Sequence, residues 1–208
     1  MDGRWLTDVE LLDEEVVLRP LQPDDKAGLI KAASDGRLWE LWYTGVPSRE
    51  TAAAYIQEAL ANKQVGTALP FVVIDRASGA IIGSTRFCNA EPSHRRLEIG
   101  YTWYARRYQR TGVNTQCKLL LLTHAFEQLG AVAVEFRTHW HNQASRNAIS
   151  RLGAKQDGIL RNHRVEPDGA RRDTVVFSII DAEWPSVRKS LKFRQQRQAD
   201  MNGGPRSG

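Results

Sequence analysis

The 208-residue chain has few cysteines and no long apolar run, and each shortage excludes a class of protein. Its two cysteines, Cys88 and Cys117, are too few for a disulfide framework and lack the paired spacing of a zinc site, so we expect both to be reduced and Cys117 to lie in the core. No stretch reaches the roughly 18 apolar residues that a membrane-spanning helix needs. The N-terminal residues are acidic, whereas a secretory signal is basic and then apolar. The sequence therefore predicts a cytoplasmic protein with no membrane partner.

The positive charge is concentrated at the C-terminus. The net charge is +5, yet residues 188–208 hold six Lys or Arg and one Asp, which leaves residues 1–187 with 23 basic and 23 acidic residues. We expect one domain over residues 1–187 and a basic, flexible tail over residues 188–208. The neutral domain argues against a nucleic-acid-binding protein, a function that stays open only through the tail.

Hydrophobic periodicity predicts a mixed α/β domain. The expected strands span residues 16–21, 70–75, 80–90, 95–105, 132–139, 155–165 and 173–180, and the expected helices lie at 23–33, from 48 onward, at 114–130, at 142–153 and near 183–193. The strands at 95–105 and 132–139 flank a long helix, so a crossover must join them and they are expected to be parallel.

One strand carries an isolated carboxylate. Along it the apolar residues alternate with the polar or small residues: Leu97, Ile99, Tyr101 and Trp103 against Arg96, Glu98, Gly100 and Thr102. This pattern predicts that Glu98 and Thr102 share one face of the sheet.

The junction that follows has the character of an anion site. Gly112 directly precedes the strongest predicted helix, no acid occurs between Glu98 and Glu127, and four basic residues lie there: Arg106, Arg107, Arg110 and Lys118. A helix N-terminus leaves backbone N–H groups unpaired and carries partial positive charge, which suits a phosphate. A glycine before a helix is also common in ordinary turns, so the junction alone leaves a structural role open.

Two motifs resemble those of a known family. QRTGVN resembles the Q/R-x-x-G-x-G/A pyrophosphate loop of the GNAT superfamily of N-acetyltransferases, and NQASRNAISRLGA is similar to its second motif, with Asn142, Ser145, Leu152 and Gly153 in register. EIGYTWYARRYQRTG resembles the RimJ/RimL-like, ribosomal-protein acetyltransferase-like branch in particular. The resemblance covers about residues 14–182.

The resemblance implies both a fold and a reaction. The fold would be α/β (α+β), with a central, mixed, mostly antiparallel seven-stranded sheet and helices on both faces. The reaction would be direct transfer of an acetyl group from acetyl-CoA to a primary amine in a ternary complex. The amine would belong to a protein or peptide N-terminus or to a small molecule, and a homodimer stays open.

Three positions depart from the family pattern. Asn114 replaces the second small residue of the loop, Ala154 replaces a usual Phe, and Ile149 stands where many members have a tyrosine that protonates the leaving thiolate. The departure at Ala154 affects packing, whereas those at Asn114 and Ile149 leave open a second function, a non-catalytic acyl-CoA-binding or interaction module.

The expected catalytic residues are Glu98 and Ser145. An amine with a pKa of about 8 to 10.4 is mostly protonated at pH 7, so a base must remove its proton, and Glu98 is the only carboxylate on its strand. The resemblance gives Ser145 the role of proton donor to the thiolate. The alternative roles are an ion pair of Glu98 with Arg95 or Arg96 and helix capping by Ser145.

The cofactor and acceptor sites are expected on either side of this pair. The cofactor-binding residues would be Tyr101, Thr102, Trp103, Arg107, Gln109, Arg110, Thr111, Gly112, Val113, Asn114, Thr115, Asn142 and Ser145. A backbone N–H near Tyr101 to Trp103 would stabilise the oxyanion, where the strand diverges from its parallel neighbour.

Aromatic residues and histidines complete the candidates. Trp39, Trp42 and Tyr43 are similar in position to the acceptor wall of the family, with core packing as the alternative. His139 and His141 lack a third ligand cluster, so no metal is expected, and either one is an alternative base.

Overall fold

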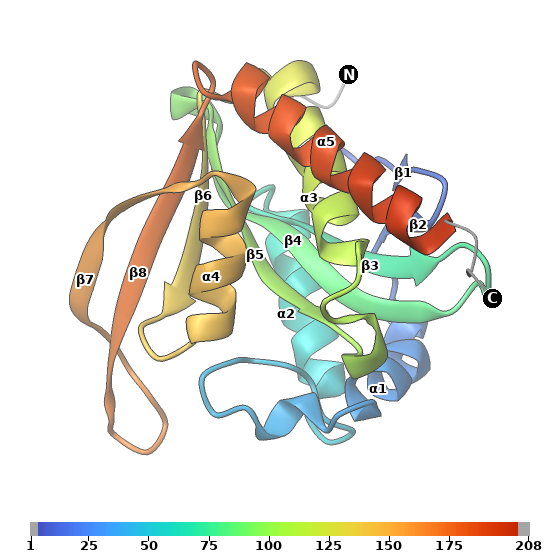
Figure 1. Cartoon of the computed structure of the whole chain (residues 1–208). Helices are drawn as coiled ribbons and strands as arrows, with labels where there is room; N and C mark the ends of the chain where they lie inside the picture. The colour runs from blue at the N-terminus through green and yellow to red at the C-terminus, as the bar shows by residue number, and fades with distance from the viewer. Residues whose placement is uncertain (1–3, 204–208) are drawn as a thin grey trace.

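In the computed structural model, which describes residues 4–203, eight strands form one sheet (Figure 1). The strand order is β1-β2-β3-β4-β5-β6-β8-β7, and only β5 and β6 pair in parallel among these strands. The strands are β1 (Leu11–Leu12), β2 (Val16–Pro20), β3 (Leu69–Asp75), β4 (Ile81–Glu91), β5 (Arg96–Tyr104), β6 (Ala133–His139), β7 (Lys155–Val165) and β8 (Arg171–Ile180).

Five α-helices and several shorter helical turns connect these strands within the described residues. The α-helices are α1 (Lys26–Ser34), α2 (Ala52–Gln64), α3 (Val113–Thr123), α4 (Gln143–Leu152) and α5 (Trp184–Gly203). The short turns are η1 (Pro23–Asp25), η2 (Leu38–Glu40), η3 (Pro92–His94), η4 (Arg106–Tyr108) and η5 (His124–Gln128), the last of which continues α3 as a π-helix. No helix in residues 4–203 is long and apolar enough to cross a membrane.

The expected fold class is confirmed, with one strand more than expected. The additional strand is β1, in which Leu11 and Leu12 pair with Leu18 and Val17 of β2. A strand of two residues is too short to produce an alternating pattern, so periodicity cannot reveal it. The predicted parallel pair is β5 and β6.

The sheet buries both of its faces against helices. The larger apolar cluster joins one face to α3, α4 and α5 and includes Cys117, Leu121 and Phe136. The smaller cluster joins the other face to α1 and α2 and includes Leu29 and Ile56. Both cysteines are buried and unpaired. The two layers are called the α3 face and the α2 face below.

Helix α5 extends beyond the expected domain boundary. It continues through residues 188–203, and Leu191 is buried in the larger cluster. Its polar side chains reach other elements: Arg188 pairs with Glu127 at 2.9 Å, and Arg194 donates a hydrogen bond to the carbonyl of Arg151. The prediction of a flexible tail is therefore wrong for residues 188–203, because the helix packs on α3, and residues 204–208 lie outside the described part.

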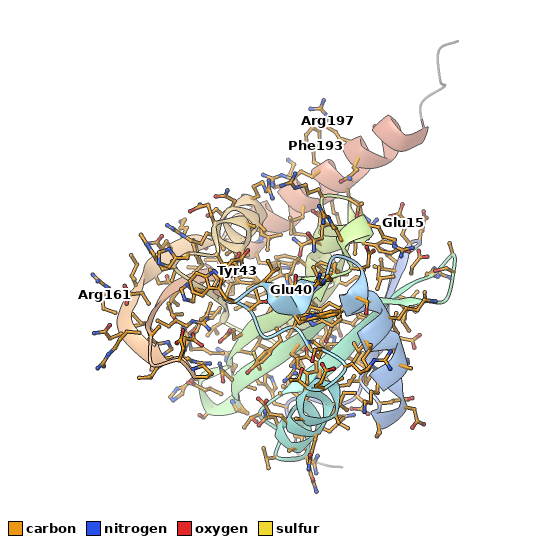
Figure 2. The ribbon with its side chains drawn as sticks, turned by 90° about the horizontal axis from the view of Figure 1, so that it is seen from below. Glu15, Glu40, Tyr43, Arg161, Phe193 and Arg197 are labelled. Atoms are coloured by element: carbon orange, nitrogen blue, oxygen red, sulfur yellow. The ribbon has the colours of Figure 1, made fainter. Side chains whose placement is uncertain are left out.

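Replacing Leu191 tests whether α5 belongs to the domain. Leu191→Ala should lower the free energy of unfolding by about 2–5 kcal/mol, because it leaves a cavity in the larger cluster. Phe193→Ala is the matched control, since Phe193 is 58% exposed and projects from α5 (Figure 2), and it should change that free energy by less than about 0.5 kcal/mol. Urea unfolding measures both; equal and small effects would mean that α5 does not pack as described.

Candidate active site

Strands β5 and β6 separate after a short stretch of pairing. Their parallel pairs run from Arg96 opposite Ala133 to Glu98 opposite Glu135, whereas β5 continues to Tyr104. The two strands diverge toward the lower part of the view in Figure 1. Beyond Glu98, this edge of β5 has no strand partner among the described residues, so its peptide groups are available to an extended ligand.

A β-bulge at Tyr101 changes the direction of the side chains along β5. Tyr101 has a φ of +52°, and the register against β4 shifts beside it. Leu97 and Ile99 pack in the larger cluster, whereas Trp103 packs in the smaller one. The predicted alternation is wrong beyond Ile99, because the extra residue of a bulge reverses the two faces of a strand.

Thr102 consequently points to the α3 face and not to the face of Glu98, so the prediction that the two share a face is wrong. Its hydroxyl accepts a hydrogen bond from Lys118 Nζ at 2.7 Å and lies 2.8 Å from Thr85 Oγ1. Lys118 is buried, and burial lowers its pKa to about 8. Lys118 therefore does not contribute to the basic surface expected before α3.

Glu98 lies on the α2 face and is buried. Asn89 Nδ2 donates a hydrogen bond to Glu98 Oε2 at 2.7 Å, and Arg137 Nε lies 3.5 Å from the same oxygen. Burial raises the pKa of Glu98, while Asn89 and Arg137 oppose that rise. A buried carboxylate with a raised pKa binds a proton more readily than an exposed one, which suits a general base.

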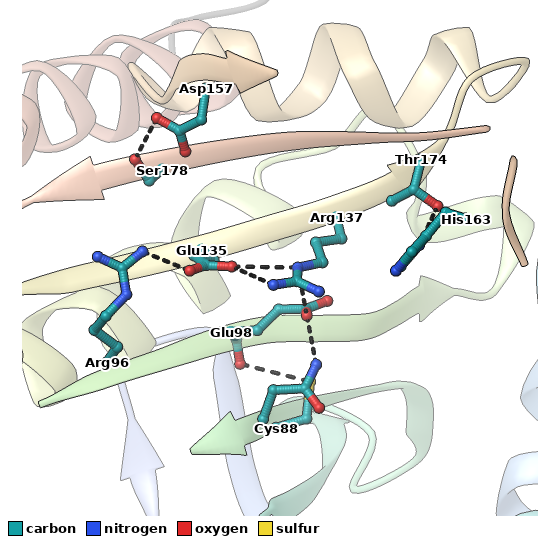
Figure 3. A network of polar contacts seen from close by, with 10 residues as sticks. Cys88, Arg96, Glu98, Glu135, Arg137, Asp157, His163, Thr174 and Ser178 are labelled. Carbon is teal, nitrogen blue, oxygen red and sulfur yellow. Dashed lines mark hydrogen bonds and ion pairs between the residues drawn. The ribbon is translucent and has the colours of Figure 1, made fainter. Parts of the chain in front are cut away.

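A network of charges on β5 and β6 fixes this carboxylate (Figure 3). Arg137 is held at 2.9 Å by Glu135, and Glu135 also pairs with Arg96 at 2.5 Å. Arg96 is thus bound elsewhere and does not form the predicted alternative ion pair with Glu98. Sequence reasoning missed Asn89 and Arg137; the alternation of β6, which puts Glu135 and Arg137 on the face opposite Phe136, is the signal that could have indicated Arg137.

The loop before α3 is closed by hydrogen bonds of its own. Gln109 Nε2 donates to the carbonyl of Tyr104 at 2.9 Å, and Thr111 Oγ1 donates to that of Tyr108 at 2.7 Å. Helix α3 begins at Val113, whose side chain is buried and whose backbone N–H donates a hydrogen bond to Thr111 Oγ1 at 3.4 Å. Asn114 and Thr115 follow in the first turn, where N–H groups have no intrahelical partner and attract anions.

A cavity of 380 Å³ lies beside this loop. Its lining residues are Gly36, Leu38, Leu41, Arg106, Gln109 and Arg110. Arg107, predicted to bind the cofactor, instead pairs with Asp35 at 2.7 Å and holds the pKa of that carboxyl below its usual value. This pair joins the loop to the segment after α1, and the two segments together form the cavity wall.

Helix α5, part of which was expected to be a flexible tail, contacts the loop at Gly112. Its φ is −73°, so its backbone conformation does not require glycine. A Cβ at this position would lie 3.4 Å from Gln198 Oε1 of α5. The end of α5 therefore lies against the loop.

The N-terminus of α4 leaves the hydroxyl of Ser145 unused. Asn142 caps the helix, and its Oδ1 accepts a hydrogen bond from the backbone N–H of Ser145 at 3.0 Å. Asn142 thus performs the side-chain capping considered for Ser145, whose half-buried hydroxyl makes no hydrogen bond within the described residues. Ile149 is buried in the larger cluster.

The three predicted acceptor-wall residues do not stay together. Trp39 packs against the smaller cluster, as the alternative role predicted. Trp42 is 65% exposed, and its ring lies 5.5 Å from that of Tyr43 and 4.9 Å from that of His139 at the end of β6. Trp42 and Tyr43 therefore form a wall on the α2 face.

His139 is less suited than Glu98 to accept a proton. Its Nδ1 accepts a hydrogen bond from the backbone N–H of His141 at 3.0 Å, and burial lowers its pKa. The neutral ring must then carry its proton on Nε2, which leaves no free lone pair. Within the described chain, no group of three or more His, Cys, Asp or Glu residues is arranged to hold a metal ion.

Comparisons with known proteins agree on one family. Residues 15–155 match the family described as "Acetyltransferase (GNAT) domain". The "Putative ribosomal N-acetyltransferase YdaF" of Bacillus subtilis is 30% identical over 106 residues, which cover 51% of this chain and 57% of YdaF. The match thus spans little more than half the length of that relative.

Solved structures resemble the whole fold. A putative acetyltransferase from T. thermophilus has a TM-score of 0.79 and 30% identity, covering 91% of this chain and 98% of its own. The structure described as "Mycobacterium smegmatis RimJ in complex with CoA-disulfide" has a TM-score of 0.73 and 25% identity, covering 90% and 94%.

The buried Lys118 should make stability depend on pH. Its pKa is about 8 in the folded state against 10.5 for an ordinary lysine, so the unfolded chain binds more protons between these values. The free energy of unfolding should therefore rise with pH across that window, by at most about 1.4 kcal/mol per pH unit from this group. Lys118→Met should remove that rise. Urea unfolding from about pH 7.5 to about pH 10 measures it, and parallel curves for the two proteins would contradict the burial of an ionisable amine.

Proposed function

Because the chain belongs to the GNAT acetyltransferase family, in its RimJ/RimL-like branch, we propose that it transfers an acetyl group from acetyl-CoA directly to a primary amine in a ternary complex. The observation that carries the proposal is the open edge of β5. The loop before α3 follows the end of this strand, and Glu98 projects from the strand on the α2 face. The thioester can then bind near the start of α3 while the amine approaches from the α2 face.

The residues around this edge fit acetyl-CoA. Free N–H groups in the first turn of α3 suit a pyrophosphate, and Arg106 and Arg110 line the adjacent cavity with positive charge. The unpaired peptide groups of β5 suit the amides of an extended pantetheine chain. When bound, acetyl-CoA supplies an activated acetyl thioester.

Glu98 takes the proton of the amine, directly or through a water. Asn89 and Arg137 hold Glu98 Oε2, while the neighbouring oxygen, Oε1, lies beside Gly100. The backbone N–H groups between Tyr101 and Trp103 donate to the carbonyl oxygen as negative charge develops on it. The positive φ of Tyr101 turns the local peptides away from regular strand geometry, which supports a donor that faces the opening.

Ser145 gives a proton to the departing thiolate. Its hydroxyl is half-buried at the start of α4 and has no other partner among the described residues, because Asn142 performs the capping. A thiol with a pKa of about 8.5 is a tolerable leaving group, so this donor assists the reaction without being indispensable. Ile149, at the usual tyrosine position, takes no part.

The acceptor class that the site supports best is a protein or peptide N-terminus. An α-amine with a pKa of about 8 has a larger neutral fraction at pH 7 than a lysine side chain, so its proton is easier for the base to remove. The wall of Trp42 and Tyr43 suits the apolar part of such an acceptor. The name "Putative ribosomal N-acetyltransferase YdaF" adds support from similarity. A small-molecule amine is the second candidate.

A panel of acceptors tests the proposed reaction. Peptides with free N-termini, the same peptides with blocked N-termini and a lysine side chain, and small amines are incubated with acetyl-CoA, and products are measured by mass spectrometry. The proposal predicts acetylated product with release of one CoA per product, with free N-termini reacting fastest. Absence of acetylation across the whole panel, with acetyl-CoA bound, would contradict it.

The pH dependence of Glu98→Gln tests the base. The variant keeps the shape and the contact with Asn89 but cannot accept a proton, so kcat/KM should fall about 100-fold at pH 7. It should recover toward wild type by about pH 9, where an α-amine is already neutral. Glu91→Gln, the same change at the exposed end of β4, is the control and should leave the profile unchanged. A deficit of equal size at every pH would assign Glu98 to binding instead of proton transfer.

A further inference from the structure

A buried arginine on β4 plays no part in the reaction as described. Arg86 is 1% exposed. Its guanidinium carbon lies 4.4 Å from the ring centroid of Tyr55 on α2 and 4.1 Å from that of Tyr101 on β5. Both rings thus lie within cation–π distance of the guanidinium and stabilise its positive charge.

The guanidinium lacks the partners that a buried charge requires. Its Nε and Nη2 atoms are both buried without a hydrogen-bond partner, and no carboxylate pairs with Arg86 anywhere in residues 4–203. Arg172 also has a buried Nε without a partner, but its Nη1 forms an ion pair with Glu166 Oε1 at 3.8 Å. A buried cation without a counter-charge is destabilising, so Arg86 is retained at a cost to the folded state.

The two unpartnered atoms define a geometry. Because a guanidinium is planar and its N–H bonds lie in that plane, its hydrogen bonds form in the plane. Nε–H and Nη2–H lie on the same edge of the group and point in parallel. Two parallel N–H donors match the two oxygens of a carboxylate, which is the preferred partner of arginine in this arrangement.

The position of Arg86 relates it to the amine. Arg86 lies opposite Gly100 and Cys88 lies opposite Glu98 in the pairing of β4 with β5, so Arg86 and Glu98 share the α2 face. The two positions are two residues apart along the strands, which is about 7 Å. The two side chains therefore leave the same face of the sheet from positions that one small molecule, or one or two residues of a peptide, can span.

We propose that Arg86 binds a carboxylate of the acceptor, so that the preferred substrates carry a carboxylate within a few bonds of the amine. This assignment rests on the proposed acetyl transfer. Because the two donor atoms are buried, this binding requires a neighbouring ring to move, and Tyr101, which is 44% exposed, is the more exposed of the two rings. The carboxylate can come from two sources: the α-carboxylate of a free amino acid, or the side chain of Asp or Glu near a peptide N-terminus.

Matched pairs of acceptors test the assignment and separate the two sources. One arm compares free amino acids with their amides, and the other compares peptides bearing Asp or Glu near the N-terminus with the same peptides bearing Asn or Gln. In one arm the acid should react with a kcat/KM about 100-fold above that of its amide. Equal rates within every pair of both arms would overturn the proposal with no variant needed.

Variants then assign the preference to Arg86. Arg86→Gln should bring the ratio of acid to amide close to unity, chiefly by raising KM for the acid, and should leave the rate with the amide within about threefold. Arg49→Gln, at an exposed position before α2, is the control and should keep the full preference. A preference that persists in Arg86→Gln would overturn the proposal.

Binding measurements distinguish this proposal from the proposed function. Calorimetry of the acid and amide probes in the presence of CoA reports on Arg86 without turnover. Tighter binding of the acid by wild type, lost in Arg86→Gln, would support the assignment even if no acceptor were acetylated, in which case only the proposed reaction would fail. If wild type binds acid and amide equally and still acetylates an acceptor, the role of Arg86 would be refuted while the proposed reaction would stand.

Discussion

The early end of pairing between β5 and β6 is the constraint on which the rest of the site depends. A parallel pair that stops at Glu98 leaves peptide groups unsatisfied in the middle of a sheet, which is costly unless a ligand or solvent satisfies them. The bulge at Tyr101 lies in this unpaired stretch and directs Thr102 and Trp103 to faces opposite to those expected of a regular strand. The strand edge is thereby open while both faces of the sheet stay packed.

The two faces of the sheet divide the chemistry. The helix N-terminus of α3 belongs to the α3 face, and the adjacent cavity, lined by Arg106 and Arg110 and by the segment after α1, suits a polyanionic donor. The α2 face carries Glu98 with its network and the aromatic wall at Trp42, which suits an amine. Donor and acceptor need not compete for one pocket, and this separation is what a direct transfer between two bound substrates requires.

Local patterns in the sequence were sufficient where local forces decide the structure. Helix α3 and the loop before it followed from apolar spacing and Gly112, and the parallel pair followed from the crossover. The bulge was not predictable, because nothing in the side chain of Tyr101 favours a positive φ, and one extra residue reversed the faces after Ile99. Three further features depend on contacts between segments that are distant in the sequence, so composition cannot predict them. They are the burial of Lys118, the packing of α5 at Leu191 and the absence of hydrogen-bond partners at Arg86 Nε and Nη2.

Hydrogen–deuterium exchange with and without CoA tests the central claim, that the open edge of β5 and the start of α3 bind the donor. CoA should slow exchange within residues 99–103 and 112–115, because the N–H groups there that face the opening become hydrogen-bonded to it, and should leave β7 unchanged. Protection at saturating CoA that is confined to other segments, such as the cavity between His139 and Asp173, would contradict the account.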